Sequence, residues 1–389
     1  MTVKPTPIPA TYRVVAMNGS AAAPVTVTPL DGGYVLANGL IEVRIDADGL
    51  LRSVREAGGG REAIAPGGAG NLLQLHPDAP NLWPAWNLER HYRNTKRDLT
   101  AENGVPATLT LTDEGPLLAV VRIGRTFGDS TLVQDVRLAA GAHRLDIATD
   151  IDWRERDAVL KAAWEFDVHA EHASAEIQYG HLNRPTHENT SWDAARFEAW
   201  AHRWVHVGEH GFGAAVITDS TYGYDATRQT RPEGGTTTTV RLTLLRAPNS
   251  PDPKADLGRH RFGYAVVPGA DTRDALAEAH SLNLPLRPAP AGAGARPLVS
   301  VDNPDIVVEC VKLADDQSGD VVVRLYESRG GRASGRLTAG FPLATAQVTD
   351  LLERPVADGG LEAADGAFDL TLRAFQILTL RLTPGTVDG

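Results

Sequence analysis

Cysteine is almost absent from this sequence, since Cys310 is the only one among 389 residues. A single cysteine excludes an internal disulfide framework and a cysteine-rich zinc site, so nothing here indicates an oxidising compartment. No apolar run approaches the length of a membrane-spanning helix, and the start of the chain lacks the apolar core of an export signal. We therefore expect a soluble cytoplasmic protein without a membrane partner.

Basic clusters and the common catalytic motifs are also missing. Lys and Arg total 38 against 49 Asp and Glu, which gives a formal net charge of -11, and the charges are spread without a basic run. This distribution argues against a nucleic-acid partner. The sequence contains no phosphate-binding loop, no GxSxG elbow, no HExxH motif and no dinucleotide fingerprint.

What the sequence does contain is apolar and polar residues that alternate with a period of two. In "RLDIATDIDW" the apolar residues from Leu145 to Trp153 alternate with Asp and Arg, which predicts a strand with one buried and one wet face. Tyr34 to Val54 reads as a hairpin or meander around the Asp48-Gly49 turn. Similar runs recur between Gly, Pro, Asn and Asp along the chain, and this rhythm is typical of a large antiparallel sandwich.

One helix and one linker divide the chain. "DTRDALAEAHSLNLPL" predicts a helix that begins at Asp271 or Thr272 and stops before Pro285. "PAPAGAGARP" cannot build a core and reads as a linker. The predicted organisation is a lead-in over residues 1–30, a β-domain over 31–287, a linker over 288–297 and a smaller β-sandwich over 298–385.

The stretch "RPTHENTSWDAARFEAWAHRW", Arg184 to Trp204, is rich in aromatic and polar side chains. Trp192, Trp200 and Trp204 could stack on sugar rings or pack in the core, where most tryptophans are buried. His202, His206 and His210 recur every four residues. On a strand, however, the outer two lie too far apart to share one ion at about 3.3 Å per residue, so we expect no zinc site here.

Carboxylates could supply the acid and base of a glycosidase, which stand about 5 to 5.5 Å apart for retention or about 6.5 to 9.5 Å for inversion. The spacing along the chain does not show that any pair meets this condition. The candidates are Asp152, Glu155, Glu165, Asp193 and Glu198.

The same stretch resembles the carboxy-terminal half of the α-mannosidases of glycoside hydrolase family 38, bacterial and vacuolar type. The matching residues are Gly180, "RPTH" (184–187), "NTSWD" (189–193), "ARFE" (195–198) and "HRW" (202–204). "NLLQLHPDAPNLWPAWNLERHY" (71–92), "YGYD" (222–225), "LTLLRAPNSPDPKADLGRHRFGYAVVP" (242–268), "AHSLNLPLR" (279–287), "VECVKLADD" (308–316) and "RLYES" (324–328) resemble other family blocks in the same order. One departure is Pro84 and Asn87, which stand where the family's "WDAWD" has aspartates.

The resemblance implies a mainly β fold: a large mutarotase-like antiparallel β-supersandwich followed by a small carboxy-terminal β-sandwich. It also implies a retaining α-mannosidase whose zinc ion, nucleophile and acid/base lie in an amino-terminal α/β barrel. No segment from Met1 to Val54 has the alternating strand and helix pattern of such a barrel. We therefore expect no catalytic residue and no cofactor in this chain. The expected partners are the zinc-bearing α/β barrel, in the same or a neighbouring chain, and an α-mannoside carbohydrate. The chain could also form a homo-oligomer.

For the site itself, we expect Arg184 to Glu198 to form a wall of the mannose pocket, with Arg184, His187, Asn189, Trp192 and Asp193 contacting substrate. The alternative is that these side chains form an internal polar network that holds the sheet. Two other functions remain open: a free-standing carbohydrate-binding β-protein, or an aldose epimerase using a His and Glu pair.

Overall fold

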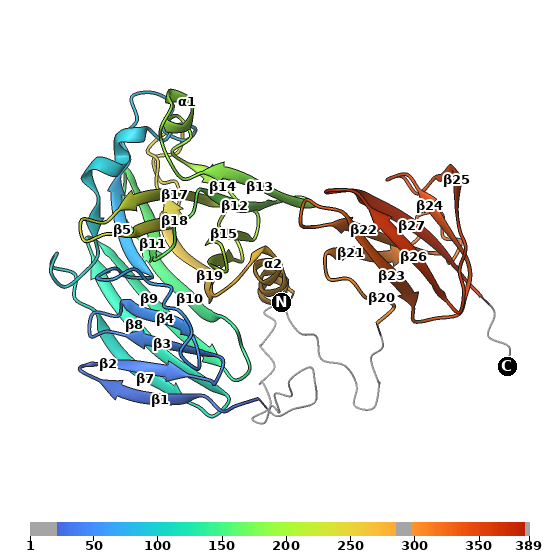
Figure 1. Ribbon diagram of the computed structural model, residues 1–389. Coiled ribbons are helices and arrows are strands. Elements are labelled where there is room, and N and C mark those ends of the chain that lie inside the picture. Colours follow the sequence, from blue (N-terminus) through green and yellow to red (C-terminus); the bar gives the residue numbers. More distant parts are fainter. Residues whose placement is uncertain (1–21, 285–296, 386–389) are drawn as a thin grey trace, which may run out of the picture. The chain divides into compact units, whose positions relative to one another are not determined.

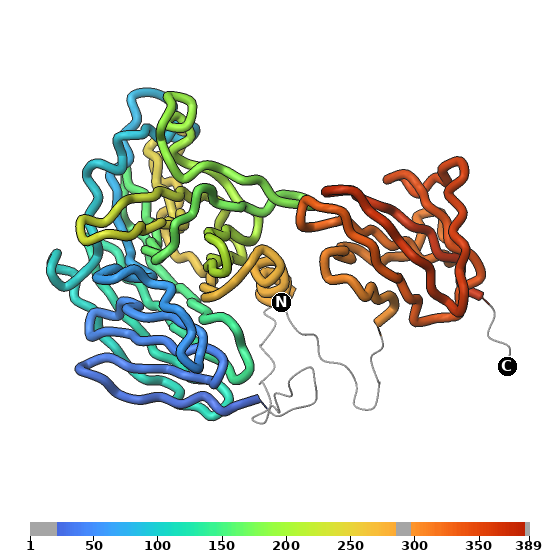
Figure 2. Tube along the Cα trace, in the orientation of Figure 1, coloured from blue at the N-terminus to red at the C-terminus, as the bar shows by residue number. Residues whose placement is uncertain are grey.

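The computed structural model describes residues 22–284 and 297–385. They group into two compact units. The first contains the described residues up to 173 together with 185–271, and the second contains 174–184 and the residues from 272 onward. Figures 1 and 2 follow the chain through both. The predicted linker, apart from its last residue, and most of the predicted lead-in lie outside the described residues.

The first unit begins with a four-stranded antiparallel meander. Its strands alternate buried apolar and wetter residues, as Ile41, Val43 and Ile45 show against Glu42 and Arg44. The predicted meander is therefore confirmed. The strands, in order across the sheet, are β1 (Thr26–Leu30), β2 (Gly33–Ala37), β3 (Ile41–Ile45) and β4 (Leu51–Glu56).

Seven strands of the large antiparallel sheet lie wholly within the first unit. β10 has alternate residues buried from end to end, which confirms the pattern read in Leu145 to Trp153. Across the sheet the order is β15 (Trp204–Glu209), β16 (Phe212–Thr218), β19 (Gly258–Pro268), β10 (Leu145–Trp153), β9 (Ser130–Ala139), β8 (Leu118–Phe127) and β7 (Thr108–Glu114).

A six-stranded sheet faces the large one. Trp164 of the smaller sheet meets Tyr264 of the large sheet edge-on at 6.5 Å between ring centroids. The Tyr264 hydroxyl donates to Asn71 at 2.5 Å and accepts from Gln134 at 2.6 Å, so this buried hydroxyl is satisfied by side chains of the core itself. The order is β14 (Ala199–Trp200), β17 (Gly223–Thr230), β18 (Thr236–Arg246), β11 (Ala158–Phe166), β5 (Leu72–Pro77) and β6 (Arg97–Asp98).

Helical segments are short and few among the described residues. η1 (Arg90–Thr95) is a 3-10 helix, α1 (Ser191–Ala194) is a single turn, and α2 (Thr272–Asn283) is the predicted helix, which buries Ala275, Leu276 and Ala279. Over residues 22–284 and 297–385 no helix is long and apolar enough to cross a bilayer.

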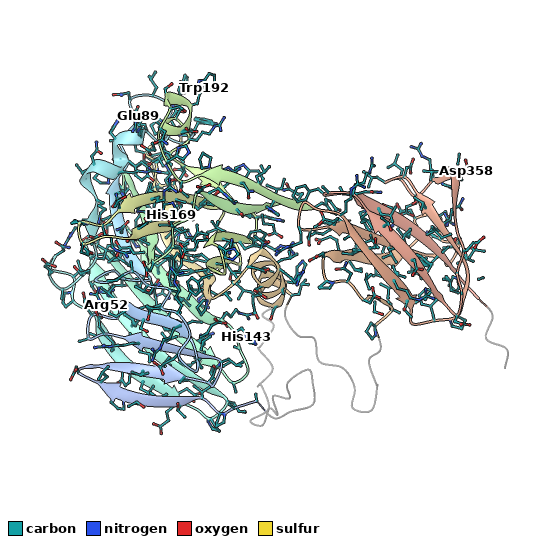
Figure 3. The ribbon with its side chains drawn as sticks, in the orientation of Figure 1. Arg52, Glu89, His143, His169, Trp192 and Asp358 are labelled. Carbon is teal, nitrogen blue, oxygen red and sulfur yellow. The ribbon has the colours of Figure 1, made fainter. Side chains whose placement is uncertain are left out.

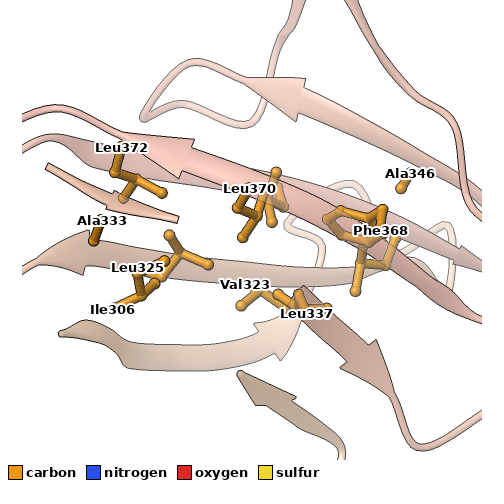
Figure 4. Packing of buried hydrophobic residues seen from close by; sticks show 11 residues of the cluster. Ile306, Val323, Leu325, Ala333, Leu337, Ala346, Phe368, Leu370 and Leu372 are labelled. Carbon is orange, nitrogen blue, oxygen red and sulfur yellow. The ribbon is translucent and has the colours of Figure 1, made fainter. Parts of the chain in front are cut away.

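The second unit is a two-sheet β-sandwich with its own core. Val323, Leu325, Leu337, Phe368 and Leu372 are almost fully buried between the sheets (Figure 4). One sheet runs β20 (Val299–Val301), β23 (Ala333–Ala339), β26 (Ala367–Leu372); the other runs β21 (Ile306–Leu313), β22 (Val321–Glu327), β27 (Ile377–Pro384), β24 (Leu343–Thr349), β25 (Pro355–Leu361). The hairpin β12 (His172–Ile177) and β13 (Gly180–Pro185) carries residues 174–184 of this unit.

Candidate functional site

Polar residues gather on one face of the six-stranded sheet. Lys161 on β11 pairs with Gln74 on β5, and Asp225 on β17 pairs with Arg241 on β18. Partners directly opposite each other in an antiparallel ladder share a face. Because the side-chain period of a strand is two, His76 lies on this face as well. Lys161, Asp225 and His76 are each buried to 98% or more.

A charge cluster forms at the centre of this face. The Lys161 ammonium donates to Asp225 at 2.7 Å and to Glu198 at 2.5 Å. Arg241 donates to the second oxygen of Asp225 at 2.7 Å, and the Arg93 guanidinium lies 3.4 Å from the same oxygen. Buried charges are tolerated when they are paired in this way.

The protonation states in the cluster follow from these contacts. Burial alone would lower the pKa of Lys161, but the Asp225 and Glu198 carboxylates outweigh it and raise that pKa above its ordinary value. Burial alone would raise the pKa of Asp225, but Lys161, Arg241 and Arg93 hold it well below its usual range. Both groups are therefore charged at neutral pH, and Asp225 cannot serve as a general acid there.

Two covering segments are anchored by the cluster. The Tyr92 hydroxyl of η1 donates to Glu198 at 3.1 Å, and Arg93 donates to Glu188 at 3.0 Å and to the carbonyl of Phe197. Arg90 also donates to Glu188, at 2.8 Å. Figures 1 and 2 show η1 and α1 at the same end of the unit. The stretch from Thr186 to Glu198 is thus held at both ends.

Beside the cluster lies a pocket of about 610 Å³. His76 contributes to its wall, and neither ring nitrogen of His76 has a hydrogen-bond partner within the described residues. Burial and the nearby Lys161 charge lower the pKa of His76 to about 4, so the ring is neutral at pH 7. The lining residues are His76, Arg93, Lys96, Thr186, His187, Glu188, Asn189, Thr227, Arg228, Gln229, Thr230 and Arg241.

The five residues predicted to contact substrate do not converge on one point. His187 and Asn189 line the pocket. Asp193 lies in the first turn of α1, whose N-cap is Thr190. The Thr190 hydroxyl accepts from the Asp193 backbone N–H and donates to the Asp193 carboxylate, which lies 3.6 Å from the His187 ring. The Trp192 side chain is 76% exposed on α1 (Figure 3), and Arg184 belongs to the residues of the second unit.

The tryptophans of the quoted stretch divide between core and surface. Trp204 is buried in β15, whereas Trp200 is 44% exposed. Core packing therefore describes Trp204 and not Trp192 or Trp200. In the loop between β5 and η1, Trp83 and Trp86 are 64% and 72% exposed and meet edge-on at 6.4 Å.

A half-buried arginine holds the loop that carries Trp83 and Trp86. Arg246 donates to Asp78 at 2.6 Å and to the carbonyls of Pro84 at 2.6 Å and Asn87. Pro84 and Asn87 are the positions where the sequence departs from "WDAWD", and here it is their backbone carbonyls that contact Arg246. The loop therefore presents two exposed indoles on a fixed backbone.

Metal ligands and an acid/base pair find little support among the described residues. His206 donates to the carbonyl of Ala270 at 2.8 Å, and no group of three His, Cys, Asp or Glu side chains within 22–284 and 297–385 fits a metal ion. Glu155 accepts from the Ser130 hydroxyl and Glu165 from the Ala69 N–H, so these carboxylates serve the framework.

The charge cluster is the feature that sequence patterns did not reveal. Lys161 interrupts the otherwise apolar run "AVLKAAWEF", and His76, Asp225 and Arg241 sit at the matching parity of three other strands. A polar residue at the same phase in several apolar strands is the signal that could have found it. The sequence could still not have shown which of these polar residues contact one another, because that depends on how the strands pair.

These features define a mainly antiparallel β-protein with a polar pocket on the outer face of one sheet. Residues 36–254 match the model of the glycosyl hydrolases family 38 C-terminal domain, and residues 305–380 match the family's C-terminal beta sandwich domain. The chain belongs to glycoside hydrolase family 38 and corresponds to the carboxy-terminal region of its α-mannosidases.

Relatives and solved structures agree with this assignment. The chain is 39% identical over 366 residues to Alpha-mannosidase 2C1 of Homo sapiens, covering 92% of this chain and 34% of that protein. It is 28% identical to the Alpha-mannosidase of Saccharomyces cerevisiae, covering 94% and 36%. An alpha-mannosidase structure from Enterococcus faecalis V583 shares the fold with a TM-score of 0.72 at 18% identity, over 94% of this chain and 43% of that one. The chain thus spans about a third of the length of the curated relatives it matches.

Proposed function

We propose that this chain is the non-catalytic β-region of an α-mannosidase and works together with a separate catalytic region, the zinc-bearing barrel that the family resemblance implies. The observation that carries the proposal is the exposure of Trp83, Trp86 and Trp192 on anchored segments. Arg246 holds the loop of Trp83 and Trp86, and the charge cluster anchors the stretch that carries Trp192. Large exposed aromatic side chains on a rigid backbone are typical of a surface that another protein region covers.

In this proposal the segment from Pro185 to Asp193 supplies part of the wall that faces the mannoside. His187 and Asn189 offer donors and acceptors that suit sugar hydroxyls, and Trp192 offers a ring face. The charge cluster has a positioning role, because Glu198 and Glu188 tie the segment to Lys161 and Arg93. The reaction chemistry belongs to the catalytic region, and no residue of this chain is assigned a step in it.

The experiment compares the chain alone with a chimera. In the chimera, residues 22–385 replace the corresponding third of the human relative, and both proteins are assayed on 4-nitrophenyl α-mannoside. We expect no turnover by the chain alone and turnover by the folded chimera. Turnover by the isolated chain, or a folded chimera without activity, would contradict the proposal.

Two variants of the chimera test the pocket wall. His187→Ala and Asn189→Ala should each lower kcat/KM at least about tenfold, because one lost hydrogen bond in the transition state costs at least about 1.4 kcal/mol. The melting temperature should not change. Asn103→Ala, in an exposed turn of the same unit, is the matched control. Lost stability with unchanged kcat/KM would place these residues in the framework instead.

A second candidate function is a free-standing carbohydrate binder. It is favoured by the pocket's completeness, since every lining residue belongs to the first unit. Titration calorimetry of the chain with mannose and mannobiose decides this point. Saturable heat would support an autonomous binding site, and its absence would leave the mannosidase role alone.

A further inference from the structure

The pocket beside His76 has more positive than negative charge. Four of its lining side chains are cationic, Arg93, Lys96, Arg228 and Arg241, and one is a carboxylate, Glu188. Asp225 and Asp98 are not among the lining residues, and Asp225 is shared by Lys161, Arg241 and Arg93. The carboxylates of the site are therefore fewer than the cations around them.

The cations differ in how they are held. Arg93 binds Glu188 and Arg241 binds Asp225, while Lys96 binds Asp98 at 2.7 Å. Arg228 is half-buried and contacts only the Nε2 atom of His169 at 3.2 Å and the carbonyl of Ala170 at 3.4 Å. No carboxylate of the described part of the chain pairs with it. A guanidinium in a pocket without a carboxylate partner is suited to an oxyanion, which it can bind through two N–H groups.

The rest of the wall offers neutral polar groups. His76 is 1% exposed, and both its ring nitrogens are unpartnered within the residues described. A neutral imidazole provides one donor and one acceptor, as a sugar hydroxyl requires. Asn189, Gln229 and Thr230 add amide and hydroxyl groups around it. A buried polar group without a partner in a cavity calls for a ligand or an ordered water to satisfy it.

We propose that this pocket binds an anionic hexose, a sugar that carries a phosphate or a carboxylate group. Arg228, with Arg93 and Arg241 beside it, takes the oxyanion, and His76 with the neutral side chains takes the hydroxyls. The volume of about 610 Å³ lies within the usual size of a small-molecule site. The inference rests on the proposed role of this pocket in sugar binding and narrows its ligand class.

Titration calorimetry on the full chain tests the inference with mannose 6-phosphate, mannuronate, mannose and inorganic phosphate. We expect saturable binding of at least one of the two sugar anions, at least tenfold tighter than that of mannose or inorganic phosphate, and weaker binding at higher salt. The stronger of the two sugar anions identifies the acidic group. Equal affinity for mannose, equal affinity for inorganic phosphate, or no binding of either sugar anion overturns the proposal.

Substitutions locate the binding to this pocket. Arg228→Gln breaks no ion pair and should weaken binding of the sugar anion at least tenfold. Arg261→Gln, at an 82% exposed arginine on the other sheet, should leave it unchanged. His76→Gln should weaken binding while circular dichroism and the melting temperature report on folding. Unchanged affinity in Arg228→Gln refutes the assignment. A chimera that cleaves a neutral mannoside, while the chain binds no sugar anion, leaves the proposed function standing and removes only this inference.

Discussion

The Lys161 ammonium lies 2.7 Å from the Asp225 carboxylate, and both side chains are closed off from solvent. Lys161 sits in a strand whose neighbouring residues are almost all buried and apolar. The lysine is tolerated because Asp225 and Glu198 accept hydrogen bonds from its ammonium group. Through these bonds Lys161 connects β11 with β17 and with the covering segment that ends at Glu198. A change at this pair should therefore affect the sheet and the pocket together.

Lys161→Met should lower the free energy of unfolding by about 3 to 5 kcal/mol, because it leaves buried carboxylates with one cation fewer. Urea denaturation measures the effect. Asp150→Asn removes a carboxylate from an exposed pair with Arg261 and should cost less than about 1 kcal/mol. A Lys161→Met protein as stable as the wild type would show that the cluster contributes nothing net to folding.

The stability of the protein should depend on pH through His76. Burial, together with the Lys161 charge, lowers the pKa of His76 to about 4, below its unfolded value of about 6.5. The unfolded chain therefore binds a proton between these values that the folded protein does not. The contribution of His76 is fully present above pH 6.5 and is lost as the pH falls towards 4.

Between pH 7.5 and pH 5, His76 should thus remove about 2 kcal/mol from the free energy of unfolding. Urea titrations at the two pH values, on the wild type and on His76→Gln, measure this difference, which should shrink in the variant. His143→Gln changes an exposed histidine (Figure 3) and is the control. If His76→Gln keeps the full pH dependence, the ring is not held neutral by its surroundings.

The loop that carries Trp83 and Trp86 should become more mobile when Arg246 is replaced. Arg246→Met deletes the bonds to Asp78 and to the carbonyls of Pro84 and Asn87, and it leaves the buried Asp78 without its cation. We expect hydrogen exchange in residues 79–89 to rise at least tenfold, since local opening would no longer cost those bonds. Arg261→Gln should leave exchange there unchanged. Wild-type protection in Arg246→Met would mean that other contacts fix the loop.

The stability of the second unit should depend on Phe368, an aromatic residue of its core. Phe368 is 2% exposed between the two sheets, and Phe368→Ala should cost about 3 to 5 kcal/mol through lost burial and a new cavity. Hydrogen exchange in β22 and β27 reports on this unit within the whole chain. Thr371→Ala, at an exposed position of the same strand, is the control. Equal protection in the two variants would contradict the core assignment.

Local pattern predicted much of the secondary structure. Leu145 to Trp153 alternates strictly, and a half-buried strand needs nothing beyond that alternation and the turns that flank it. α2 follows from its apolar stripe, and the mainly β class follows from the repetition of such strands. The family resemblance extended this reading to a specific region of a known enzyme family. These features are encoded by residues close together in the sequence, so the sequence by itself determined them.

The site was decided by tertiary structure. Lys161, Asp225 and Glu198 are separated by 37 to 64 positions in the contacts they make, and only strand pairing and the course of the covering segment bring them together. The exposure of Trp83, Trp86 and Trp192 likewise contradicts the usual burial of tryptophan, because the loops that carry them are fixed by Arg246 and by the charge cluster. The sequence of each strand determines which side chains share a face. Which of those faces lie side by side in a sheet depends on strand pairing between segments that are distant along the chain.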